Sequence, residues 1–195
     1  MRDQIKERLT KRVSKIVTTL EAEQARFGWI RDRRGMRYLP TDMFLRMEDY
    51  SAGLEYLKWF GINFPKDKGF PEFLLEWTII LFKTGNFKDA KKMAFRTYCS
   101  NIYFFNNYFG QEITPIKKFE KSDHEAADYV KTVHFKEGNP KMTDFDEWLK
   151  QVSSFKKFVE LTEKFVEIRK KLLVEQDSMV RNQLNRQERA LVEEI

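Results

Sequence analysis

A short glycine-bounded segment, residues 28–35, concentrates positive charge beside Trp29. Its candidate phosphate-binding side chains, counting the arginine that directly follows the segment, are Arg31, Arg33, Arg34 and Arg37. A basic segment of this kind attracts nucleic acid, anionic lipid or an acidic protein, and charge alone does not choose among them. The remaining alternative is an ordinary solvated surface.

The charge balance sets this region apart from the rest of the chain. Residues 1–40 hold eleven Lys/Arg against five Asp/Glu, out of 36 and 30 in all, so the remaining residues carry 25 of each sign. The whole net charge of +6 therefore lies in the first fifth of the sequence.

No comparable set of residues predicts catalysis or metal binding. His124 and His134, the two histidines, are ten residues apart, which does not place them on adjacent helical turns. Cys99 is the single cysteine, so no internal disulfide can form, and in an aromatic-rich segment it is expected to be a small core residue. Glycine-rich phosphate loops and nucleophile elbows are absent from the sequence. We expect no enzymatic activity, no metal and no cofactor.

The elements that position these residues are all predicted to be helices. Over residues 5–20 the apolar side chains recur three or four apart, which indicates a helix running to about Phe27. Helical spacing resumes at Pro40, stops at Pro65 and returns over residues 73–82 and 87–94. No segment alternates as a strand would, so we predict an all-α fold.

The last quarter of the chain also has helical periodicity. Thr143 is predicted to cap a helix whose first turn holds Asp144, Asp146 and Glu147. No Gly or Pro follows, so one long helix of 53 residues is expected, with a bend near residues 176–178. The domain prediction is a basic helix and linker over 1–37, a helical-hairpin core over 38–140, and the long helix over 141–195.

An internal repeat appears when the chain is shifted by 37 residues. Glu48-Asp49-Tyr50 then pairs with Gly85-Asn86-Phe87, and Gly53 with Ala90. A polar turn followed by a small residue allows two antiparallel helices to approach closely.

At these residues the sequence resembles the tetratricopeptide-repeat family, in about two degenerate units over residues 38–102. The second unit carries the likeness best, and the first departs from it at Gly53, which replaces the usual Ala, and at Glu48, which replaces the turn Gly. The resemblance implies stacked helical hairpins whose first helices line a groove for a peptide or helix of another protein. The groove residues that it implies are Asp42, Leu45, Arg46, Glu72, Leu75, Ile79, Phe82 and Lys83.

Two functional hypotheses follow. The leading one is a non-enzymatic interaction or scaffold module that binds a protein partner in this groove. The alternative is a nucleic-acid-associated accessory protein that uses the basic N-terminal segment. The apolar stripes of the terminal helices either cover the hairpins or pair with a second copy, so a homodimer is an open alternative. No apolar stretch is long enough for a signal peptide or a membrane span, and we expect a cytoplasmic protein.

Overall fold

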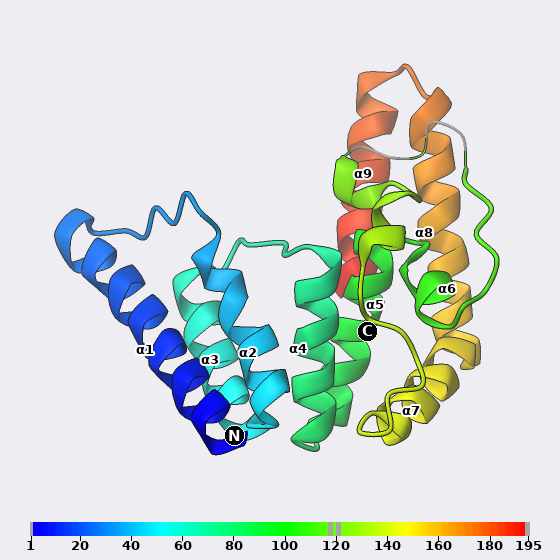
Figure 1. Cartoon of the computed structure of the whole chain (residues 1–195). Coiled ribbons are helices and arrows are strands. Elements are labelled where there is room, and N and C mark those ends of the chain that lie inside the picture. The colour runs from blue at the N-terminus through cyan, green and yellow to red at the C-terminus, as the bar shows by residue number, and fades with distance from the viewer. Residues whose placement is uncertain (1, 117–118, 120–121, 194–195) are drawn as a thin grey trace. The chain divides into compact units, whose positions relative to one another are not determined.

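The computed structural model describes residues 2–116, 119 and 122–193, and within them it contains helices and no strand. The α-helices are α1 (Arg2–Phe27), α2 (Leu39–Met47), α3 (Tyr50–Asn63), α4 (Pro71–Lys83), α5 (Phe87–Ser100), α6 (Phe104–Tyr108), α7 (Thr143–Ser154), α8 (Lys156–Val174) and α9 (Ser178–Glu193) (Figure 1). Three 3-10 helices, η1 (Met36–Tyr38), η2 (Asp123–Glu125) and η3 (Tyr129–Thr132), lie between them. The predicted all-α class is confirmed. Met1 and the last two residues, which the predicted terminal helices include, lie outside the described residues.

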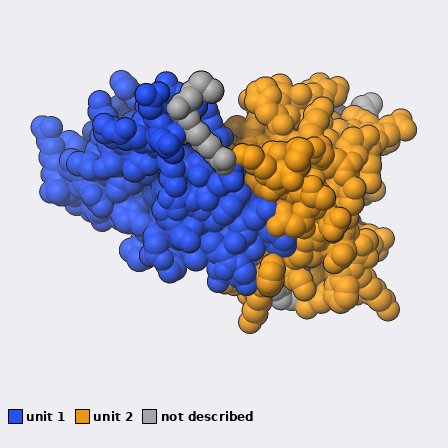
Figure 2. All heavy atoms as spheres, turned by 60° about the horizontal axis from the view of Figure 1, so that its bottom comes forward, with its two compact units in different colours: residues 1–69, 79–86 blue, residues 70–78, 87–195 orange. Residues whose placement is uncertain are grey.

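The chain forms two compact units (Figure 2). Unit 1 comprises residues 1–69 and 79–86, and unit 2 comprises residues 70–78 and 87–195. Helix α4 therefore contributes its first half to unit 2 and its second half to unit 1. None of the helices described is long and apolar enough to cross a membrane.

In unit 1, α1 packs against α2 and η1. Its buried side chains are Leu9, Val13, Ile16 and Leu20, which share one face because of their three- and four-residue spacing. Burying a side chain of this size contributes about 1.5–3 kcal/mol, so this stripe holds α1 to the unit. The helix ends at Phe27, as the sequence predicts.

The α2–α3 hairpin explains why glycine stands at position 53. Glu48 has a left-handed backbone, with φ of 57°, and the Asp49 carboxylate caps α3 by accepting a hydrogen bond from the Ala52 amide. A Cβ atom on Gly53 would lie 3.0 Å from Ile80 Cδ1 and 3.3 Å from Phe44 Cβ. The close approach of these helices thus leaves little room for the alanine that the repeat pattern would place there.

The predicted long C-terminal helix is wrong, because residues 143–193 form three helices. Phe155 is extended and separates α7 from α8, and residues 175–177 form the turn before α9, near the predicted bend. The hydroxyls of Ser153 and Ser154 bond to backbone carbonyls of the last turn of α7, which gives the chain an alternative to continuing the helix. Thr143 is the first residue of α7 and its cap position is Met142, so the predicted threonine cap is also wrong.

Unit 2 is organised around α5, which packs against α8 and α9. Helices α8 and α9 run antiparallel side by side (Figure 1). Between them Arg169, almost fully buried, forms ion pairs with Glu125 and with Glu188. It also donates to the Phe119 carbonyl at 3.1 Å, so one side chain joins α8, α9 and the segment around η2.

Candidate functional site

The loop after α1 is held in place by two carboxylates that bond to its own backbone. Glu23 Oε2 accepts hydrogen bonds from the amides of Arg31 and Asp32, each at 3.1 Å. The buried Asp32 carboxylate accepts from the amides of Met36, at 2.7 Å, and Arg37, at 3.0 Å. Both carboxylates therefore bond to the loop backbone, and these bonds set the backbone conformation of the segment that carries the arginines.

Arg37 is the one predicted basic residue that faces inward. Its guanidinium pairs with Asp32 at 3.0 Å and with Asp67 at 2.8 Å, and it donates to the Tyr38 hydroxyl. Burial opposes the charged form, but Asp67, Tyr38 and Asp32 together outweigh it and raise the pKa of Arg37. Burial, together with the hydrogen bond to Asp67, raises the pKa of Tyr38 to about 12. Arg37 is therefore part of the structural anchor of the loop and does not share a surface with the other three arginines.

Arg31, Arg33 and Arg34 are exposed, and they share their surface with two aromatic rings. Trp29 is 57% exposed and Phe27 44% exposed. The Arg31 guanidinium lies 5.4 Å from the Trp29 ring centroid. Arg26, which is not among the basic residues predicted from the sequence, lies 5.1 Å from the centroid of Phe27. We call residues 26–34 the arginine-aromatic loop; it combines flat apolar surfaces for stacking with four guanidinium groups for phosphate.

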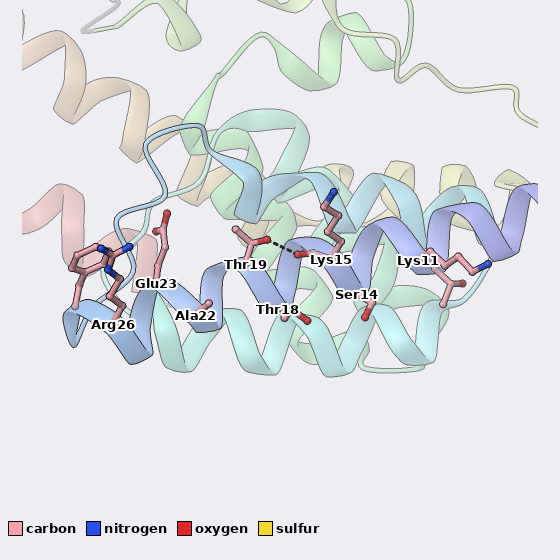
Figure 3. A pocket seen from close by; sticks show the side chains of 10 residues that line it. Lys11, Ser14, Lys15, Thr18, Thr19, Ala22, Glu23 and Arg26 are labelled. Carbon is pink, nitrogen blue, oxygen red and sulfur yellow. Dashed lines mark hydrogen bonds between the residues drawn. The ribbon is translucent and has the colours of Figure 1, made fainter.

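A shallow depression of about 900 Å³ lies on the exposed face of α1 and reaches this loop (Figure 3). It is lined by Thr10, Lys11, Ser14, Lys15, Thr18, Thr19, Ala22, Glu23, Arg26 and Phe27. The middle of the depression is low because the residues at positions 14, 18 and 22, one helical turn apart, have short side chains. Lys11 stands at one end and Arg26 at the other, and Lys15 borders the middle on the same side of the helix as Thr19 (Figure 3). The depression could have been predicted from the i, i+4 spacing of these short side chains, but a search for hydrophobic periodicity does not find it.

The predicted groove residues do not form one exposed surface. Leu75 and Ile79 are 0% and 1% exposed and Leu45 is also buried, so these three side chains fill the core and are closed to a partner. The Glu72 carboxylate accepts a hydrogen bond from the Tyr129 hydroxyl within unit 2.

The other predicted groove residues lie in unit 1. Asp42 and Arg46 form an exposed i, i+4 pair at 3.7 Å. Phe82 is half-buried, and the Lys83 ammonium lies 5.9 Å from its ring centroid.

His124 and Cys99 take packing positions, whereas His134 is exposed. His124 stacks on Phe70 with ring centroids 6.0 Å apart and meets the edge of Tyr129. Burial raises the pKa of the Cys99 thiol well above its ordinary value, which disfavours the reactive thiolate. Across the described residues, no three His, Cys, Asp or Glu side chains are grouped so that they could hold a metal ion.

Comparisons of the chain with protein-family models, curated proteins and solved structures gave no match.

Proposed function

We propose that the protein binds single-stranded nucleic acid through the arginine-aromatic loop. The observation that carries this proposal is the joint exposure of Trp29 and Phe27 among four guanidinium groups, while Glu23 and Asp32 are turned to the backbone. Single strands are bound by stacking unpaired bases on aromatic rings and by cations that follow the phosphates.

The chemistry of the surrounding surface favours a nucleic-acid strand over a lipid bilayer. A helix that lies in a membrane interface buries an apolar face among the acyl chains. The face of α1 next to the loop carries hydroxyls and lysines instead, among them Ser14, Thr18 and Lys15. A single strand is favoured over a duplex because the bases of a duplex are stacked on one another, which keeps their faces from Trp29.

The direct test is fluorescence anisotropy with a labelled oligodeoxythymidylate of twelve nucleotides. Stacking on one aromatic residue contributes about 1–3 kcal/mol, so Trp29→Ala should weaken binding about 5- to 150-fold. Removing Arg31, Arg33 and Arg34 together should reduce the slope of log affinity against log salt by about 2, since each phosphate contact contributes about 0.7.

Matched controls come from unit 2. Phe155→Ala removes another exposed aromatic ring, and Lys156→Ala/Lys157→Ala/Lys164→Ala removes three exposed positive charges from α8. Both controls should bind as the wild type does. The proposal is wrong if the Trp29 and triple-arginine variants also bind like the wild type. Binding to phosphatidylserine vesicles without binding to the oligonucleotide would replace it with a membrane function.

A protein partner is a second candidate, favoured by the turn between α8 and α9. Val174 and Met179 are 77% and 80% exposed there, and exposed apolar groups of this kind are typical of association sites. On this proposal the interaction module uses the α8–α9 turn and a second copy of the chain is one partner. The repeat resemblance belongs to the same proposal, and the small residues Gly53 in α3 and Ala90 in α5, the first closely packed and the second completely buried, support it.

Sedimentation equilibrium tests this second candidate. A dimer that is lost in Val174→Asp/Met179→Asp and retained in Ile62→Asp, a change at an equally exposed apolar residue of unit 1, would support it. A wild type that stays monomeric at high concentration would contradict self-association through this turn.

A further inference from the structure

We infer that the bound strand continues from the arginine-aromatic loop along α1, with its phosphates in the depression that runs from Arg26 past Lys15 to Lys11. This inference rests on the proposed function and adds the path and the length of the ligand. The depression shares Arg26 and Phe27 with the loop, so a strand stacked on the exposed rings lies at one end of the depression on α1.

The depression has the donors that a phosphate backbone requires. Thr19 donates its hydroxyl to the Lys15 carbonyl at 2.7 Å, and Thr10 donates to the Lys6 carbonyl at 3.0 Å, so these two hydroxyls are used within the helix. Ser14 and Thr18 point to the opposite side of the helix from Thr19 in Figure 3. Within the part of the chain that the structure describes, neither hydroxyl forms a hydrogen bond, so both can donate to phosphate oxygens.

The electrostatics of the depression match an anionic strand. Its lining carries three cationic side chains and one carboxylate. That carboxylate, Glu23, accepts hydrogen bonds from two loop amides, which offsets part of its charge toward the solvent. Lys11 also pairs with Glu7 at 2.7 Å, but exposed pairs of this kind contribute little and a phosphate can replace the carboxylate.

The spacing of the cations sets the length of strand. Lys11 and Arg26 are fifteen residues apart, which corresponds to about 22 Å along a helix that rises 1.5 Å per residue. At 3.4 Å per nucleotide of a stacked strand this distance holds about six nucleotides. With about two more stacked at the loop, the site should be filled by about eight.

A length series tests this path. Affinity of the wild type for oligodeoxythymidylates of three, six, nine and twelve nucleotides should rise to about eight nucleotides and then level off. Lys11→Gln/Lys15→Gln should weaken binding of the twelve-nucleotide strand about tenfold at low salt and reduce its salt slope by about 1.4. The same variant should bind the three-nucleotide strand as the wild type does, because that strand reaches only the loop.

Two further variants separate charge from shape. Thr18→Leu fills the middle of the depression at an exposed position. It should remove the rise in affinity between the three- and nine-nucleotide strands, while circular dichroism shows an unchanged helix content. Lys156→Gln/Lys157→Gln removes two exposed charges from unit 2 and should change neither the length dependence nor the slope.

The outcomes distinguish this inference from the proposed function. If the wild type binds none of the oligonucleotides, both fail. If it binds three and twelve nucleotides equally well and the α1 variants match it, the strand does not follow α1, although the loop still binds nucleic acid. If Lys156→Gln/Lys157→Gln weakens binding as much as the α1 variant does, the effect is one of net charge and the inference is also wrong.

Discussion

Replacing Arg169 by alanine should cost unit 2 about 3 kcal/mol of its free energy of unfolding. The Arg169 side chain is 5% exposed and holds Glu125 and Glu188, which are 22% and 17% exposed. Removing one member of a buried ion pair costs about 3–5 kcal/mol, because the remaining charge stays desolvated. The lower end of that range applies here, since water reaches both carboxylates in part. The alanine also loses the hydrogen bond to the Phe119 carbonyl and the contact with the Phe119 ring, whose centroid is 5.0 Å away.

Urea unfolding followed by far-ultraviolet circular dichroism measures this loss. Lys171→Ala breaks an exposed i, i+4 pair with Glu167 in the same helix and should cost under about 0.5 kcal/mol. Arg169→Met/Glu125→Gln/Glu188→Gln removes all three charges and should recover most of the stability. If Arg169→Ala stays within about 0.5 kcal/mol of the wild type, the ion-pair group does not hold unit 2 together.

Two further predictions concern packing and pH. Gly53→Ala should destabilise unit 1 by about 1–2 kcal/mol in urea unfolding, because the crowding against Ile80 and Phe44 exceeds the gain of about 1 kcal/mol in helix propensity. Gly61→Ala, which has open space around it, should stabilise the same helix. Equal effects of the two substitutions on stability would contradict the close approach of the helices at Gly53. Burial raises the pKa values of five of the seven tyrosines, namely Tyr38, Tyr56, Tyr98, Tyr108 and Tyr129, and it raises those of Tyr38 and Tyr98 to about 12. Absorbance at 295 nm should therefore show these five side chains still protonated at pH 11 in the folded protein. The contribution of these tyrosines to the free energy of unfolding is complete below pH 10, the ordinary tyrosine pKa. It should fall as the pH rises from 10 through 12, because the unfolded chain then releases protons that the folded chain retains. Ionisation of these tyrosines below pH 11 in the folded protein would refute this prediction.

The helices that carry one apolar face could be predicted from the sequence. Helix α1 is the best example, since its stripe, its partner requirement and its end at Phe27 follow from spacing alone. The break at Phe155 could not be predicted, because no Gly or Pro marks it. The hydroxyls of Ser153 and Ser154 donate to the Lys150 carbonyl there, and the sequence alone does not show these hydrogen bonds.

Two of the predicted groove residues, Leu75 and Ile79, are buried for a physical reason that the sequence of α4 contains. This helix is apolar on nearly all sides, and seven of its side chains from Phe73 to Leu81 are buried apolar or threonine residues on several faces. A helix of that kind packs on several faces, so these two positions are closed to a partner. The family resemblance assigned Leu75 and Ile79 to a surface by position, without regard to this distribution.

The sequence predicts a basic site after α1, but it identifies only some of the residues that form its surface. A cluster of arginines is typical of sites for anionic partners. The sequence does not show that Asp67, thirty residues from Arg37, pairs with that arginine and holds it inward. Nor does it show that Glu23 and Asp32 bond to the backbone, which is what leaves the outward charge of the loop positive.

The most direct measurement is the affinity of the wild type and of Trp29→Ala for the twelve-nucleotide strand at 50 mM and 200 mM salt. The wild type should bind at low salt, lose affinity steeply at the higher concentration, and exceed the variant at both, because stacking is lost while the phosphate contacts remain. Equal affinities of the two proteins, or wild-type binding that does not change with salt, would contradict the arginine-aromatic loop as a nucleic-acid site.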